Sequence, residues 1–349
     1  RGQAFRDRDY VTDYPPKYSG PQIPSSLLSR WRQFRDRDKP KAEVERRELP
    51  SVSDYLAQAR RHFGFQPERI PEREFKRRYA REALRLGLTK DQIVRIYALE
   101  TGGYGTADMQ AGVHPISGKG RPISSALGYA QLLAANSINV LSKHGGSFIE
   151  RLSANVRETR DAARRRQLED KLKVLRRMVR TAKSVPYRWS RHVQFSRTPR
   201  GMALHVMNMD GDIGPWMQVV KIADLKRMAE RKGRPRLSGA EIELMNLAGP
   251  ATGLEMMLAT GIDKPTANFF SRRGYYRNSV VRGRDSKGLL EALETRMQAN
   301  IKNKGAQEFL AVFDELLAGR PKPPRPVLAP RASNDPPPYP YRGPSLTAR

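Results

Sequence analysis

The chain has 349 residues, enough for one large domain or two ordinary ones. Its 65 Lys and Arg against 36 Asp and Glu leave a net charge of +29, which implies an anionic partner such as nucleic acid, an acidic membrane surface or a cell-wall polymer. The absence of cysteine excludes disulfides and thiolate chemistry, and no apolar run approaches the ~18 residues of a transmembrane helix.

Two polar tails are expected to flank the folded part of the chain. Residues 1–50 are rich in Arg, Asp and Pro, which predicts an extended or disordered segment. Residues 319–349 are rich in Pro and predict a polyproline-like tail. Because the chain begins at Arg1 rather than Met, we expect that a leader or another upstream segment was removed.

Between the tails, apolar residues recur with a helical period, so the sequence predicts a mainly α-helical fold. The first helices are expected at 52–63, 71–86, 89–100 and 125–143. A single long basic helix is expected at 147–183, with Leu168, Leu172, Leu175 and Val179 as its apolar stripe. The remaining helices are expected at 215–231, 240–247, 251–260, 287–302 and 306–317.

Glu100 lies on the apolar face of the helix predicted over 89–100. Ile93, Ile96 and Tyr97 stand at i, i+3 and i+4, and Glu100 follows at i+7. The segment opens with a capping-box sequence and stops at Gly102, so Glu100 should be both part-buried and near a helix C-terminus. Desolvation and the helix dipole should then raise its pKa, as a general acid requires. The alternative is a Glu that turns to water or pairs with an Arg.

Two further helices are predicted to carry a polar residue on their apolar stripe. Gln131 stands at i+4 of Leu127 in the helix predicted over 125–143. Asn246 shares a face with Ile242 and Met245, after a second capping-box sequence at 238–241. One inward polar residue is usually a satisfied core group, but three beside Gly-containing turns predict a shared polar cleft.

Three motifs in this order resemble those of the soluble lytic transglycosylases and their lysozyme-like relatives. LETGGYG at 99–105 resembles the Glu-Ser motif, and GYAQLL at 128–133 is similar to the Gly-Leu-Met-Gln-Leu motif. NLAGP at 246–250 is similar to the late Tyr-Asn-Ala-Gly-Pro motif. The resemblance covers about 88–145 and 238–280. It implies a lysozyme-like helical catalytic domain in two parts, 51–146 and 236–318, separated by a basic helical insertion at 147–235.

The resemblance also implies roles for individual residues. Glu100 would be the catalytic acid/base, and Thr101 stands where a Ser usually orients it. Asn246 stands at the position of the family's Tyr, which hydrogen-bonds the catalytic carboxyl, and Tyr97 could substitute for that contact. The residues expected to bind substrate are Thr101, Tyr104, Gly128, Tyr129, Gln131, Asn246, Tyr275 and Tyr276. The last two belong to a run at 269–278 that interleaves aromatics with Arg and could stack on sugars, on bases or on the core.

The implied reaction cleaves the MurNAc-GlcNAc β-1,4 bond of peptidoglycan and closes a 1,6-anhydro ring, so one carboxyl suffices. Asp108, in the loop after Glu100, is the candidate for a second carboxylate, which would make the chain an inverting muramidase; otherwise it is a solvated loop residue. No cofactor or metal is expected. The histidines lack metal-ligand spacing. The run at 208–212 does not continue as a calcium loop, because Ile213 stands where such a loop requires Gly and Val219 where it requires Glu.

These expectations describe an enzyme of the bacterial periplasm or cell envelope whose basic surface holds it on an anionic wall or membrane. A catalytically inactive peptidoglycan-binding or scaffold protein with the same fold is the first alternative. A basic, helical nucleic-acid-binding protein is the second. That reading ranks below the others and predicts no convergence of Glu100 with Gln131 and Asn246.

Overall fold

The computed structural model describes residues 49–319, so the tails predicted at 1–50 and 319–349 lie almost wholly outside the described residues. The described part is mainly α-helical, as the periodicity predicted. It contains no β-strand, only four isolated β-bridges between residues 110 and 285. None of its helices is long and apolar enough to cross a membrane.

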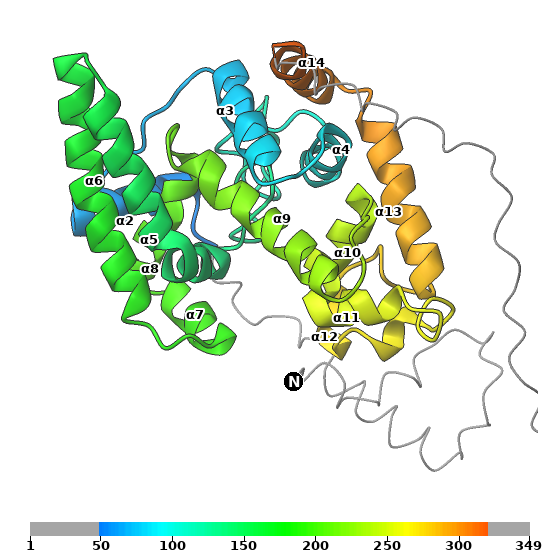
Figure 1. Cartoon of the computed structure of the whole chain (residues 1–349). Helices are drawn as coiled ribbons and strands as arrows, with labels where there is room; N and C mark the ends of the chain where they lie inside the picture. The colour runs from blue at the N-terminus through cyan, green and yellow to red at the C-terminus, as the bar shows by residue number, and fades with distance from the viewer. Residues whose placement is uncertain (1–48, 320–349) are drawn as a thin grey trace, which may run out of the picture.

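In space the helices form two groups joined by α9, and α3 and α4 belong to the same group as α10, α13 and α14 (Figure 1). The earlier part of the chain holds α2 (Val52–Phe63), α3 (Glu72–Arg85), α4 (Lys90–Thr101), α5 (Ala134–Glu158), α6 (Ala162–Lys183), α7 (Trp189–Ser196), α8 (Pro199–His205) and the 3-10 helix η3 (Val206–Met209). The later part holds α9 (Gly214–Arg231), α10 (Gly239–Ala248), α11 (Pro250–Met256), η4 (Thr266–Asn268), α12 (Arg272–Arg277), α13 (Ser286–Asn300) and α14 (Lys304–Ala318).

The prediction of one helix over 147–183 is wrong, because the chain reverses at residues 159–161. There α5 ends, and the side chain of Asp161 accepts a hydrogen bond from Arg164 N, which caps the start of α6. The two helices then pack against each other as a hairpin (Figure 1). Gly145 of α5 permits their close approach, because a Cβ atom there would lie 2.5 Å from a methyl carbon of Val179.

Two apolar clusters form the core, and α9 contributes to both. Met217 and Val220 of α9 pack with α2, α5, α6 and α8 in the second cluster. Ile222 and Leu225 pack with α3, α4, α10, α13 and α14 in the first cluster. The clusters do not follow the predicted boundaries at 146 and 235, since α2 shares a core with α5 and α6.

A buried group of charges ties α6 to the loop that precedes α9. The ammonium of Lys171, 7% exposed, lies 2.8 Å from Glu68 Oε2 and 3.0 Å from Asp210 Oδ2, and it also bonds Asp212. Arg164 contacts Glu68 and Asp212 at 2.6 and 2.7 Å. Burial alone would raise the pKa of Glu68, but hydrogen bonds from Arg164 and Lys171 lower it to about 2. The Asp-rich run at 208–212 therefore binds a lysine of its own chain.

Candidate functional site: a carboxyl pair at the end of α4

The helix α4 places Glu100 at its C-terminal end, as predicted. The capping box is present: Gln92 N donates to Thr89 Oγ1 at 3.2 Å, and Thr89 N donates to Gln92 Oε1 at 3.0 Å. The helix ends at Gly102, which adopts a left-handed conformation with φ of 64°. Glu100 itself is partly buried, one turn beyond the fully buried Tyr97.

Glu100 contacts a second carboxyl, that of Glu243 on α10, which is 5% exposed. The two groups share a hydrogen bond. Two carboxylates offer only acceptors, so one of the pair must carry a proton. Burial and then the charge of Glu243 raise the pKa of Glu100 well above its ordinary value. Burial also raises the pKa of Glu243, but hydrogen bonds from Glu100 and Asn246 oppose this, so we place the proton on Glu100.

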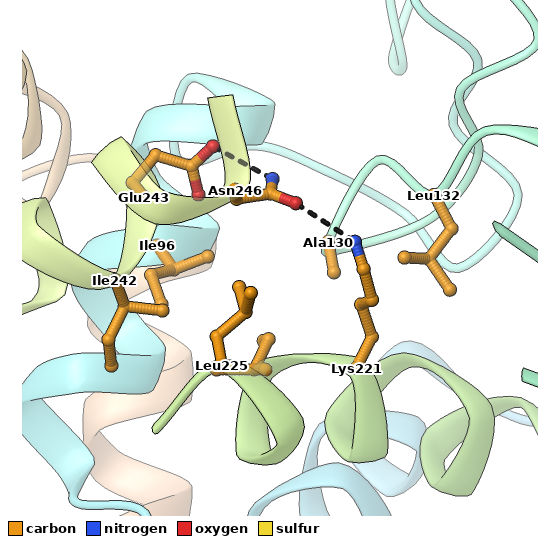
Figure 2. A pocket seen from close by; sticks show the side chains of 9 residues that line it. Ile96, Ala130, Leu132, Lys221, Leu225, Ile242, Glu243 and Asn246 are labelled. Carbon is orange, nitrogen blue, oxygen red and sulfur yellow. Dashed lines mark hydrogen bonds between the residues drawn. The ribbon is translucent and has the colours of Figure 1, made fainter. Parts of the chain in front are cut away.

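Lys221 of α9 supplies the counter-charge for the pair. Asn246 lies between them: its Nδ2 donates to Glu243 Oε1 at 3.0 Å, and its Oδ1 accepts from Lys221 Nζ at 3.2 Å (Figure 2). Burial lowers the pKa of Lys221, while the charges of Glu243, Asp224 and Glu100 act in the opposite direction. A charged Lys221, an ionised Glu243 and a neutral Glu100 together leave the cluster without net charge.

A small cavity of about 10 Å³ separates α4, α9 and α10 beside this cluster. Lys221, Glu243 and Asn246 line it together with the apolar side chains of Ile96 and Leu132 (Figure 2). That space holds about one water molecule and is far too small for a sugar ring. Glu100 could therefore reach a substrate only from its own exposed side or after the surrounding helices separate.

The turn that carries Gly128 and Gln131 borders the same cavity through Ala130. The prediction that Gln131 lies on a helix is wrong, because α5 begins only at Ala134. Gly128 has φ of 77° and Gln131 has φ of 44°, so both adopt left-handed conformations that a helix excludes. The side chain of Gln131 folds back on its own turn, where Nε2 donates to Gly128 O at 2.7 Å.

Gln218 of α9 holds this turn in place. It is fully buried, its Oε1 accepts from Ala130 N at 3.1 Å, and its Nε2 donates to Asn208 O at 3.1 Å. A Cβ atom at Gly128 would lie 2.5 Å from Gln218 Nε2, so the glycine is needed for contact as well as for conformation.

Several of the predicted substrate-binding residues have other partners. The hydroxyl of Thr101 donates to Tyr97 O at 2.7 Å, and the hydroxyl of Tyr97 donates to Gly105 O at 2.8 Å, so neither bonds the Glu100 carboxyl. Tyr129 is 1% exposed and donates to Glu72 Oε2 within the aromatic core. The exposed Tyr104 donates to Asn303 Oδ1 at 3.0 Å.

The aromatic run near residue 275 also packs on itself. Tyr275 is buried and accepts a hydrogen bond from Gly283 N at 3.0 Å. Tyr276 is 40% exposed, and its ring meets that of Tyr275 edge-on at 5.3 Å. Asp108 pairs with Arg69 at 2.8 Å. The second carboxyl at Glu100 is therefore Glu243, not Asp108.

The sequence held signals for the residues that were missed. Glu243 precedes Asn246 by three positions, so both lie on one face of α10. Lys221 interrupts a short apolar run within α9, with Val219 and Val220 before it and Ile222 and Ala223 after it. Gln218 gave no comparable signal, because a lone amide in a buried helix commonly satisfies local backbone groups.

Within residues 49–319, no three His, Asp or Glu side chains are arranged to hold a metal ion. The cluster offers instead one protonated carboxyl backed by a fixed negative charge. Comparison with protein-family models, with curated proteins and with solved structures gave no significant match.

Proposed function

We propose that this protein is a peptidoglycan lytic transglycosylase in which Glu100 is the sole catalytic acid and base. The observation that carries the proposal is the burial of the Glu100 carboxyl beside that of Glu243, since both raise the pKa of Glu100 well above its ordinary value and so favour its protonated form. The resemblance of residues 88–145 and 238–280 to the lytic transglycosylases supports the choice of substrate. The charge of +29 supports a location in the bacterial periplasm or envelope, against an anionic wall.

A carboxyl pair in direct contact suits this reaction better than hydrolysis. Glycosidases separate their carboxyls by about 5–5.5 Å when retaining and about 6.5–9.5 Å when inverting, which leaves room for the sugar or a water. Groups that share a hydrogen bond leave no such room. A lytic transglycosylase needs no activated water, because the 6-hydroxyl of the muramoyl residue attacks within the same molecule.

Each step then has a stated proton donor and acceptor. Glu100 gives its proton to the glycosidic oxygen as the bond to MurNAc breaks. The ionised Glu100 now lies beside the ionised Glu243, so like-charge repulsion strengthens it as a base. It removes the proton of the 6-hydroxyl, which closes the 1,6-anhydro ring and restores the starting state.

The test is digestion of purified peptidoglycan followed by mass analysis of the products. The wild-type protein should release muropeptides with 1,6-anhydro-MurNAc ends. Glu100→Gln keeps the shape but cannot donate the proton, and it should lower the rate by about 10²–10⁴. Asp108→Asn is the matched control, since it removes a carboxylate from the neighbouring loop and should leave the rate and products unchanged. Reducing ends, heavier by one water, would instead show hydrolysis.

The small size of the cavity favours a second candidate, a peptidoglycan-binding or scaffold protein with the same fold. The presence of Asn246 at the position of a Tyr that would orient the acid also favours this second candidate. Such a protein would bind sacculi without releasing any muropeptide. Its binding would be the same in the wild type and in Glu100→Gln.

A further inference from the structure

The second half of α6 and the helices that follow it, up to η3, are rich in basic residues and contain no acidic residue of their own. Residues 171–209 contain ten Lys and Arg and no Asp or Glu. Six of the ten are exposed between residues 180 and 200: Arg180, Lys183, Arg188, Arg191, Arg197 and Arg200. None of the six forms an ion pair with a described residue, whereas Arg151 and Arg164 bind buried carboxylates.

Two large aromatic side chains stand out from the same surface. Tyr187 is 59% exposed and Trp189 is 52% exposed, at the connection between α6 and α7. Neither the Tyr187 hydroxyl nor the Trp189 indole N–H bonds a described residue. Tyr and Trp side chains combine an apolar ring with a polar group, and they are enriched at the interface between lipid and water. We call residues 180–200, with these aromatics, the basic corner.

Buried residues of α6 and α7 anchor the basic corner to the rest of the protein. Val185 is 9% exposed at the end of α6, and His192 of α7 is fully buried. The ring of Tyr187 packs edge-on against His192, with centroids 5.4 Å apart. The helix α7 packs on α5 and α8, and it lies at one end of the molecule, remote from α13 (Figure 1). The backbone that carries the aromatic and basic side chains is therefore already ordered before any partner binds.

We propose that the basic corner docks on a membrane surface rich in anionic lipid. Guanidinium groups bind phosphate oxygens, and exposed Trp and Tyr rings enter the headgroup region. An exposed set of basic and aromatic side chains at one end of the molecule suits a flat bilayer, whereas a nucleic-acid strand is usually held in a basic groove. This proposal does not depend on the proposed enzymatic activity.

The test is co-sedimentation of the full chain with vesicles of phosphatidylcholine alone or mixed with phosphatidylglycerol. The protein should pellet with the mixed vesicles, more weakly as salt rises, and much less with phosphatidylcholine alone. Arg188→Glu with Arg191→Glu should lower the partition coefficient by about 30-fold or more, since each basic residue contributes about fivefold. Tyr187→Ser with Trp189→Ser should weaken binding at unchanged net charge.

The matched control is Arg296→Glu with Lys302→Glu, two exposed residues at α13 and just after it that change net charge equally. This variant should retain most of the binding, and circular dichroism should show every variant folded. An equal loss in the control would overturn the proposal in favour of a general charge effect. Absence of vesicle binding by the wild type, or binding of a DNA oligonucleotide that depends on Arg188 and Arg191 in its place, would also overturn it.

Discussion

At the scale of single residues, the pairing of Glu100 with Glu243 makes a prediction about pH. Glu243→Gln removes a negative charge and offers Glu100 a hydrogen-bond donor, and both changes favour the ionised form of Glu100. The pKa of Glu100 should fall, so the alkaline limb of the pH–rate profile for muropeptide release should move to lower pH. Glu255→Gln, on the next helix, is the control and should leave the limb in place. If the alkaline limb of the profile stays at the same pH in Glu243→Gln, Glu243 does not influence the catalytic carboxyl.

The same pair predicts how stability changes with pH. Because folding raises the pKa of Glu100, its contribution is fully present below the unfolded pKa of about 4.5 and is lost as pH rises through the folded pKa. The Gln side chain of Glu100→Gln does not titrate. Between the unfolded and the folded pKa of Glu100, the unfolding free energy of this variant should therefore rise relative to that of the wild type, by up to about 1.4 kcal/mol per pH unit. Urea unfolding at several pH values measures this. Parallel curves for the two proteins would contradict it.

The position of Glu100 was readable from the sequence, while the source of its pKa shift was not. The stripe of Ile93, Ile96 and Tyr97 fixed the face of α4, and the Gly after Thr101 fixed its end. Helical periodicity describes one helix at a time. It therefore could not reveal that Glu243, 143 positions later, meets Glu100 across the interface.

At the scale of elements, the errors over 147–183 and over 125–133 have different physical causes. The segment 159–161 contains neither Gly nor Pro, so the helical pattern ran unbroken across it, and only the capping tendency of Asp161 marked the reversal. In 125–133 the apolar spacing matched a helix by coincidence. Long-range contacts decided that segment: Leu127 pairs with Gln110, and Gln218 fills the space beside Gly128.

Adjacent glycines in α5 provide a matched test of the helical hairpin. A Cβ at Gly145 would lie 2.5 Å from Val179, whereas one at Gly146 meets nothing within 4 Å. Gly146→Ala should therefore stabilise the protein by about 0.4–1 kcal/mol through helix propensity. Gly145→Ala should destabilise it by about 1–3 kcal/mol, because α5 and α6 must move apart. Thermal unfolding distinguishes them, and a gain in both variants would mean that the helices are not in contact there.

At the scale of the whole molecule, the charges around Lys171 join segments that are distant in sequence. Lys171→Met leaves Glu68, Asp210 and Asp212 without the ammonium, which should cost about 3–5 kcal/mol near neutral pH. The loss should shrink at acid pH, where the carboxyls bind protons. Lys173→Met is the control, since Lys173 is exposed and pairs at 2.9 Å with Asp170, which is exposed as well. It should leave the unfolding free energy nearly unchanged, because solvent screens an exposed ion pair. Equal effects of the two substitutions in chemical denaturation would contradict a structural role for this group.

Because α9 packs in both apolar clusters, the protein cannot be divided into independent modules at this helix. One side of the helix belongs to each apolar cluster, so a fragment that ends before Gly214, or begins after Arg231, loses a wall of its core. Neither fragment could be exchanged between proteins as a free-standing unit. A substitution on one side of α9 must therefore also be compatible with the packing of its other side.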